Sequence, residues 1–127
     1  MDQHGDLPGW EVVGRARHPR DGRAGVLVRH RRTGRYGLAQ AGHIRPVPRA
    51  WGETQAQRIE TAVAVGARIR RRREALGLTQ VQAAALADMS QGDWSALERG
   101  YQLPGLGRLE RVARALKCGV GDLLGSA

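Results

Sequence analysis

Hydrophobic and polar positions follow two different patterns in the two halves of the chain. Up to about residue 50, short runs of Val and Leu alternate with Gly, Pro and Arg, whereas after Gln55 the apolar residues recur at every third or fourth position. Short alternating runs are typical of strands, and the wider spacing is typical of amphipathic helices. The pattern therefore predicts an α+β fold in which a small β-rich module precedes a helical domain.

The first half contains four segments with strand character, separated by residues that favour turns. The predicted strands are residues 11–17, 25–32, 35–40 and 43–47. Their spacing is compatible with a small, strongly twisted antiparallel sheet or with an SH3-like barrel. Because the chain has no Phe and this half has few large apolar residues, we expect the sheet to be marginal alone and to need a partner surface.

The helical half carries clear signals for the start and end of each helix. A helix begins near Gln55 and ends at Gly77. Thr79 is the predicted N-cap of the second helix, with Gln82 completing a capping box, and Ser90 caps a third helix over residues 91–98. A fourth helix follows Pro104, and a last short one holds residues 122–124, so five short helices are expected.

These patterns divide the chain into four parts. The predicted parts are a disordered arm (1–9), a basic β-rich module (10–47), a linker (48–54) and the helical domain (55–124).

The charge of the chain narrows the class of partner. The formal net charge is +9, and residues 1–52 hold ten arginines against four acidic residues. Such an excess attracts polyanions through the release of counterions from phosphates. Lys117 is the only lysine, so almost all the positive charge is arginine. This bias is explained either by binding to phosphates or by a GC-rich genome, which also favours arginine over lysine.

Several other classes of protein are disfavoured by the composition. The single cysteine, Cys118, excludes an internal disulfide and a multi-cysteine zinc site. The histidines are scattered without metal-ligand spacing, and no nucleophile–base set or phosphate-cradling Gly loop is visible, so we expect no metal, no cofactor and no enzymatic activity. No apolar stretch is long enough to span a membrane and no secretory signal is visible. We therefore expect a cytoplasmic protein of bacterial, phage or plasmid origin that is nucleoid-associated when bound.

The stretch LGLTQVQAAALADMSQGDWSALERG resembles the Cro/repressor (XRE) family of helix-turn-helix regulators. The resemblance extends back through IRRRREA and forward through LPGLGRLERVARALKCGVGDLL, covering about residues 55–124. It implies a five-helix lambda-repressor-like domain that binds double-stranded DNA. The first helix of the helix-turn-helix motif, which is the second of the domain, crosses the DNA backbone, and the next helix enters the major groove.

The resemblance also implies roles for individual residues. The implied base contacts are Gln91, Gly92, Asp93, Ser95 and Ala96, and the implied phosphate contacts are Thr79, Gln80, Arg99 and Tyr101. Arg73 and Glu98 match a pair that forms a buried salt bridge in the family. Asp93 has an alternative role in capping its own helix, and Trp94, where the family has a β-branched residue, could pack in the core or stack on DNA.

The β-rich module places Arg31 and Arg35 beside a predicted Thr33-Gly34 turn. This basic tip could contact DNA phosphates or a groove, or it could be a solvated hairpin whose charges prevent edge pairing. A dimerisation or protein-docking role for the module is the further alternative.

Three functions fit these features. The first is a sequence-specific transcriptional regulator, a repressor that binds an inverted repeat as a homodimer. The second is an antitoxin that represses its own operon and binds a toxin through the N-terminal module. The third is an accessory DNA binder of low sequence specificity, which the small side chains of Gly92 and Ala96 would suit.

Overall fold

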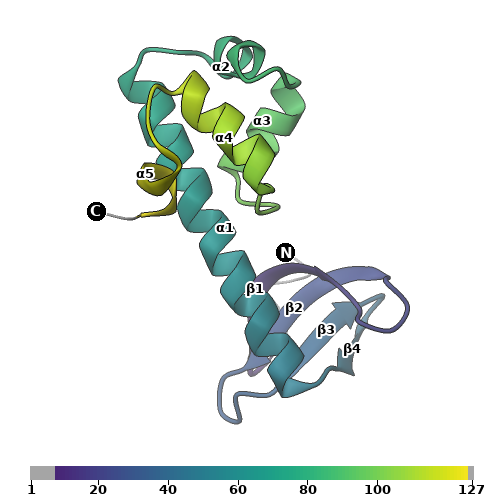
Figure 1. The fold of residues 1–127 in the computed structure, drawn as a ribbon. Coiled ribbons are helices and arrows are strands. Elements are labelled where there is room, and N and C mark those ends of the chain that lie inside the picture. Colours follow the sequence, from purple (N-terminus) through teal and green to yellow (C-terminus); the bar gives the residue numbers. More distant parts are fainter. Residues whose placement is uncertain (1–7, 126–127) are drawn as a thin grey trace. The chain divides into compact units, whose positions relative to one another are not determined.

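A computed structural model describes residues 8–125, which fall in two compact units, one up to Ile59 and one from Glu60. The first contains a β-sheet and the second a group of helices (Figure 1). Apart from its last two residues, the arm predicted for residues 1–9 lies outside the described part of the chain. Among residues 8–125 no helix combines the length and the apolar character that crossing a bilayer requires.

The sheet has four antiparallel strands in the order β1-β2-β3-β4 (Figure 1). They are β1 (Trp10–Arg17), β2 (Ala24–His30), β3 (Tyr36–Gln40) and β4 (His43–Pro46). Within the described residues only neighbours in this order are hydrogen-bonded, so of the two expected arrangements the structure has the open sheet. β2 ends at His30, earlier than predicted, because His30 N donates to Arg35 O at 2.7 Å and closes the next loop.

One face of the sheet is covered by the first turns of α1 (Arg49–Ala75). Trp51 and Ile59 of α1 pack against the buried side chains of Leu27 and Leu38. The prediction that residues 48–54 form a linker is therefore wrong from residue 49 onward, because this segment is helical. Gly52 weakens the helical signal of the sequence, since glycine is a poor helix former. The structure needs a glycine here, because an added Cβ would lie 2.6 Å from the Cβ of Tyr36.

The second unit contains the later turns of α1 and four shorter helices. These are α2 (Gln80–Leu86), α3 (Gln91–Glu98), α4 (Leu106–Ala115) and α5 (Val120–Leu124). Their buried side chains form one core, to which every helix contributes: Val65, Ile69, Ala83, Ala84, Trp94, Leu97, Leu109, Val112, Leu116 and Leu123. The prediction of an α+β chain with a five-helix C-terminal domain is confirmed.

Two glycines let α1 approach the end of α3 closely. A Cβ at Gly66 would lie 2.8 Å from the carbonyl oxygen of Glu98, and one at Gly100 would lie 2.6 Å from the Cα of Val63. Gly100 also has a φ of +70°, which glycine adopts without strain. This approach fixes the end of α3 against α1.

Candidate nucleic-acid interface

The caps predicted from the sequence define where α2 and α3 begin. Thr79 Oγ1 accepts from Gln82 N at 3.1 Å, and Gln82 Oε1 accepts from Thr79 N at 2.9 Å, so the capping box is complete. Ser90 Oγ accepts from Asp93 N at 3.1 Å and starts α3. Asp93 therefore contributes its backbone to the cap and keeps an exposed side chain. The helix-turn-helix pair is built by these local bonds and by the shared core.

The carboxylate of Glu98 connects α1, α2 and α3. Arg73 binds it through two nitrogens, with Nε to Oε2 at 2.5 Å and Nη2 to Oε1 at 3.1 Å. The indole Nε1 of Trp94 donates to Oε2 at 2.5 Å, and Gln80 Nε2 donates to Oε1 at 3.0 Å. Because the Glu98 side chain is 4% exposed and that of Arg73 is 13% exposed, this is a nearly buried ion pair with its hydrogen-bonding capacity well used.

The surroundings of Glu98 favour its charged form. Burial alone would raise the pKa of Glu98, but the hydrogen bonds from Arg73, Gln80 and Trp94 outweigh burial and hold the pKa below its ordinary value. The same contact with Glu98 raises the pKa of Arg73. Both groups are therefore ionised at neutral pH, as a stable bidentate pair requires.

A chain of hydrogen bonds runs from this pair to the first residue of α3. Gln80 Nε2 donates to Glu98, which turns Gln80 Oε1 away from the core, and this oxygen accepts from Gln91 Nε2 at 2.7 Å. The orientation of the Gln91 amide is thus set through Gln80 by the buried carboxylate. The sequence contained a signal for this link, a glutamine at the first position of both α2 and α3, but it was not recognised as a contact.

The first turn of α3 presents an accessible surface with few polar groups. Gln91, Gly92 and Asp93 are exposed and Ala96 is half-buried. Ser95 differs from the other residues implied as base contacts, because it is only 5% exposed. Because Ser95 is buried, the structure does not bring it to this surface.

Trp94 belongs to the core. Its side chain is fully buried, and its indole N–H is bonded to Glu98. A buried indole needs a partner for its N–H, which Glu98 supplies, so the family's β-branched residue is replaced here without exposing an aromatic ring. Stacking of Trp94 on a base is excluded by this position.

The loop after α3 brings together the last two residues implied as phosphate contacts. The exposed guanidinium of Arg99 lies 5.5 Å from the ring centroid of Tyr101, and its Nη1 lies 3.4 Å from the Tyr101 hydroxyl. A cation over an aromatic face is held in place without losing its charge. In contrast, Arg72 in α1 is used internally, because it donates to the carbonyls of Leu116 and Lys117 beyond α4.

Arg31 and Arg35 are both exposed in the loop between β2 and β3. Tyr36, which follows Arg35 in the sequence, is buried in the sheet core with 7% exposure. The ring of Tyr36 is therefore not available to a ligand at this basic tip.

No metal-ligand set is formed within residues 8–125, where no three His, Cys, Asp or Glu side chains come together. Two of the histidines have a different use, since Nδ1 of His18 accepts from Arg20 N and Nδ1 of His30 accepts from Arg32 N. These two side chains are parts of loop structure.

Comparisons with known proteins find similarity to helix-turn-helix proteins. A family model described as a helix-turn-helix domain matches residues 64–124. Two structures of the clp gene regulator ClgR from Corynebacterium glutamicum are each 33% identical with a TM-score of 0.50, over 52% of this chain and 70% or 86% of theirs. The restriction-modification controller protein C.AhdI from Aeromonas hydrophila is 31% identical with a TM-score of 0.48, over 49% of this chain and 94% of that one. No curated protein sequence matches the chain.

Proposed function

Because the chain belongs to the Cro/repressor family of helix-turn-helix regulators, we propose that it is a transcriptional regulator that binds double-stranded DNA through α3. The observation that carries this proposal is the hydrogen-bonded chain from Glu98 through Gln80 to Gln91. It holds a polar side chain in a fixed orientation at the accessible start of α3. A group held in this way loses little conformational entropy when it meets a base.

Gln91 has the hydrogen-bonding capacity to read adenine. Gln80 takes one of the two N–H groups of its Nε2, which leaves the second N–H and the Oε1 oxygen. Adenine offers N7 as an acceptor and N6 as a donor in the major groove, and a glutamine amide matches both. In the same surface, Asp93 can accept from a cytosine amino group and the Ala96 methyl can contact a thymine methyl.

Phosphate contacts are expected on both sides of α3. Thr79 is exposed at the start of α2, and the second N–H of Gln80 Nε2 is left to donate to a phosphate oxygen. Arg99, with Tyr101, supplies a charged donor after α3. Such contacts fix the register of the protein on the duplex without reading sequence.

The small base-reading surface favours a homodimer on an inverted repeat. Each good bidentate contact discriminates by about 1–3 kcal/mol, whereas specific regulators bind their sites about 4–10 kcal/mol more tightly than other DNA. One α3, with the small residues Gly92 and Ala96 at two of its accessible positions, supplies too few contacts for this difference. Two copies on half-sites one helical turn apart, about 34–36 Å, would double the number of base contacts. Repression follows where such a site overlaps a promoter.

Selection of bound duplexes from random DNA tests the proposal. The wild-type protein is expected to enrich an inverted repeat with an adenine in each half-site. Gln91→Ala is expected to lose the preference at that position alone. The recovered site, placed over a reporter promoter, should lower expression when the wild-type protein is present. Enrichment of no sequence would identify an accessory binder of low specificity, and a single half-site bound at 1:1 stoichiometry would exclude the dimer.

A further inference from the structure

The sheet unit contains two seven-residue segments that share five of their seven residues. Residues 17–23 read RHPRDGR and residues 29–35 read RHRRTGR, so the segments differ only at their third and fifth positions. The first joins β1 to β2 and the second joins β2 to β3. The two loops therefore lie at opposite ends of one strand.

The first loop is closed by its histidine. His18 N donates to Arg23 O at 2.9 Å, and His18 O accepts from Gly22 N at 2.9 Å. Nδ1 of His18 accepts from Arg20 N at 3.2 Å, and Asp21 Oδ1 accepts from Arg23 N at 2.9 Å. Gly22 has a φ of +70°, which glycine adopts without strain.

The second loop repeats each of these bonds at the equivalent residue. His30 N donates to Arg35 O at 2.7 Å, and His30 O accepts from Gly34 N at 2.8 Å. Nδ1 of His30 accepts from Arg32 N at 3.3 Å, and Thr33 Oγ1 accepts from Arg35 N at 3.3 Å. Gly34 has a φ of +72°. Two copies of one backbone geometry thus present arginines at the same positions.

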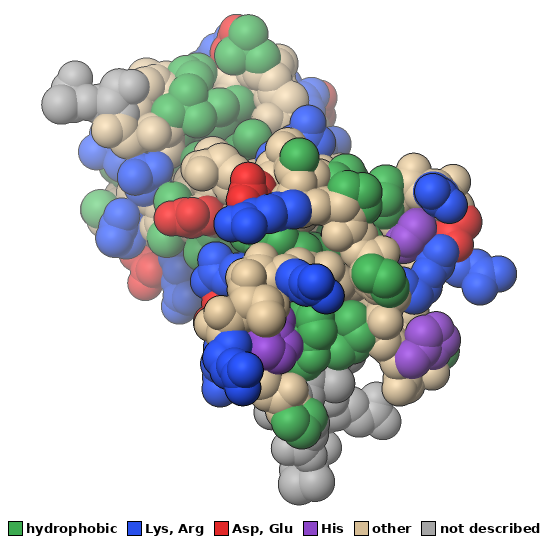
Figure 2. Space-filling model, turned by 90° about the horizontal axis from the view of Figure 1, so that it is seen from below, with side chains coloured by type: hydrophobic (Ala, Val, Ile, Leu, Met, Phe, Trp, Pro, Cys, Tyr) green, Lys and Arg blue, Asp and Glu red, His purple; other side chains and the backbone are tan. Residues whose placement is uncertain are grey.

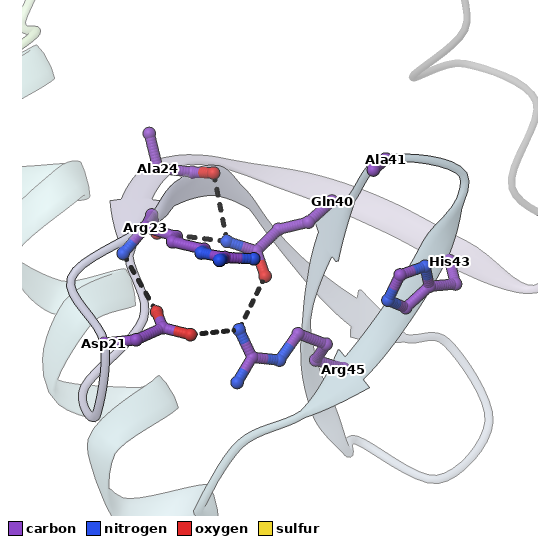
Figure 3. Close-up of a pocket in the computed structure, with 7 residues that line it drawn as sticks. All are labelled: Asp21, Arg23, Ala24, Gln40, Ala41, His43 and Arg45. Carbon is purple, nitrogen blue, oxygen red and sulfur yellow. Dashed lines mark hydrogen bonds and ion pairs between the residues drawn. The ribbon is translucent and has the colours of Figure 1, made fainter.

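Each loop is also braced from outside. Asp21 of the first loop binds Arg45 Nη1 at 2.7 Å, and Gln40, which accepts from Arg45, donates to the carbonyls of Arg23 and Ala24 beside an open pocket (Figure 3). In the second loop the His30 ring packs edge-on against Trp10, with centroids 5.0 Å apart. Both loops are therefore held before any ligand arrives, which lowers the entropy that binding must overcome.

The positive charge at the fourth and seventh positions of these loops is not neutralised by the sheet unit. The three carboxylates that the structure describes in this unit, Glu11, Asp21 and Glu53, are each paired with an arginine outside the fourth and seventh positions of the loops. The side chains at those positions are exposed and make no hydrogen bond or ion pair within residues 8–125: Arg20, Arg23, Arg32 and Arg35. Figure 2 shows basic side chains over much of one face, with histidine side chains beside some of them.

We propose that the two repeated loops are a matched pair of phosphate-binding sites for the backbone of duplex DNA. Arginine binds phosphate oxygens through two parallel N–H groups, and each loop offers two such side chains. A seven-residue strand separates the loops by about 23 Å, which is less than the 34–36 Å of one helical turn, so a single duplex can reach both. The proposal rests on the proposed function, because the covalently joined helical unit holds the same DNA at high effective concentration.

The test uses the full-length chain and two double variants, Arg20→Gln/Arg23→Gln and Arg32→Gln/Arg35→Gln. A third, Arg58→Gln/Arg114→Gln, removes the same charge from exposed helical arginines without a described partner and is the matched control. Binding to the selected duplex is measured over a range of salt concentrations, with the thermal midpoint of each variant as a check on folding. Each loop variant is expected to lower the magnitude of the slope of log K against log salt by up to about 1.8, since each phosphate contact contributes about 0.9.

The control is expected to change the slope by less than half as much, and hydroxyl-radical protection of the DNA backbone should shorten in the loop variants only. An equal effect of all three double variants would show that the loops act only through the net charge of the protein, and it would overturn the proposal. A response from only one loop would overturn the matched pair. Loss of binding to single-stranded RNA, with duplex binding unchanged, would overturn the choice of partner. In each of these cases Gln91→Ala still loses its base preference if α3 reads DNA, so the proposed function is judged separately.

Discussion

Removal of the Glu98 carboxylate should destabilise the helical unit more than any surface change. Glu98→Ala leaves the guanidinium of Arg73, which is 13% exposed, without its counter-charge. Breaking a buried pair by removing one partner costs about 3–5 kcal/mol. The N–H groups of Trp94 and Gln80 also lose their acceptor, so the lower figure is a minimum for this site.

The corresponding change in thermal midpoint is large. In a domain of 60–100 residues, 1 kcal/mol shifts the midpoint by about 4–8 °C, so 3 kcal/mol should lower it by about 12–24 °C. Helical circular dichroism at 222 nm follows the unit that contains α2 to α5. Glu110→Ala, the same truncation on the exposed side of α4, is the control and should stay within about 0.5 kcal/mol of wild type.

A cycle with Arg73→Met separates the ion pair from the other bonds of Glu98. If the pair is the dominant interaction, the double variant should lose less stability than the sum of the two single variants, because no charge is left stranded. A Glu98→Ala protein that melts within about 2 °C of the Glu110→Ala control would refute this account of the core. Additive losses would refute the ion pair as the cause.

Three further changes test the same unit. The folded pKa of Glu98 lies below its ordinary value, which is about 4.3. The stability that Glu98 contributes should therefore be complete above about pH 4.3 and be lost as the pH falls through the folded pKa. Acid titration of the wild type measures this loss, and Glu98→Gln should lack it. Gly66→Ala should cost about 1–3 kcal/mol, because the added Cβ meets the carbonyl oxygens of Leu97 and Glu98. Gly107→Ala, whose added Cβ meets nothing within 4 Å, should instead keep or slightly raise the melting temperature in the same assay, since alanine is the better helix former. Gln91→Ala should weaken binding to the selected site by about 1–3 kcal/mol and relax one base pair; equal losses on all sequences would show that Gln91 does not read a base.

The helical unit could be predicted from its sequence because its signals are local. Thr79 and Ser90 cap helices that begin at the next residue, and each cap is recognisable within four residues of chain. The Arg73–Glu98 pair was reached through the resemblance and was found in the structure. Ser95 was misplaced because the family pattern fixes its position in α3, whereas the core around Trp94 decides which side of the helix is buried.

The sheet unit could be predicted only in outline, because its decisive contacts are not local. The start of α1 depends on Trp51 and Ile59 covering the sheet, and Gly52 lowers the helical signal where the helix approaches Tyr36. The end of β2 depends on His30, which reads as a strand residue but closes a loop. Hydrophobic periodicity encodes neither the covering helix nor the acceptance of backbone N–H groups by an imidazole nitrogen.

The two units would contribute differently to binding if the loops hold phosphates. Contacts from Arg20, Arg23, Arg32 and Arg35 would raise the affinity for every duplex equally, so the ratio between the operator and other DNA would still be set by α3. Raising the salt concentration would then remove affinity mainly from the sheet unit, because its contribution is counterion release, while the hydrogen bonds of Gln91 to a base would be less affected. Discrimination between the selected site and random DNA should therefore hold constant, or increase, as total affinity falls. A discrimination that falls in parallel with affinity would mean that the sheet unit itself reads sequence, through a base contact or through the shape of the duplex.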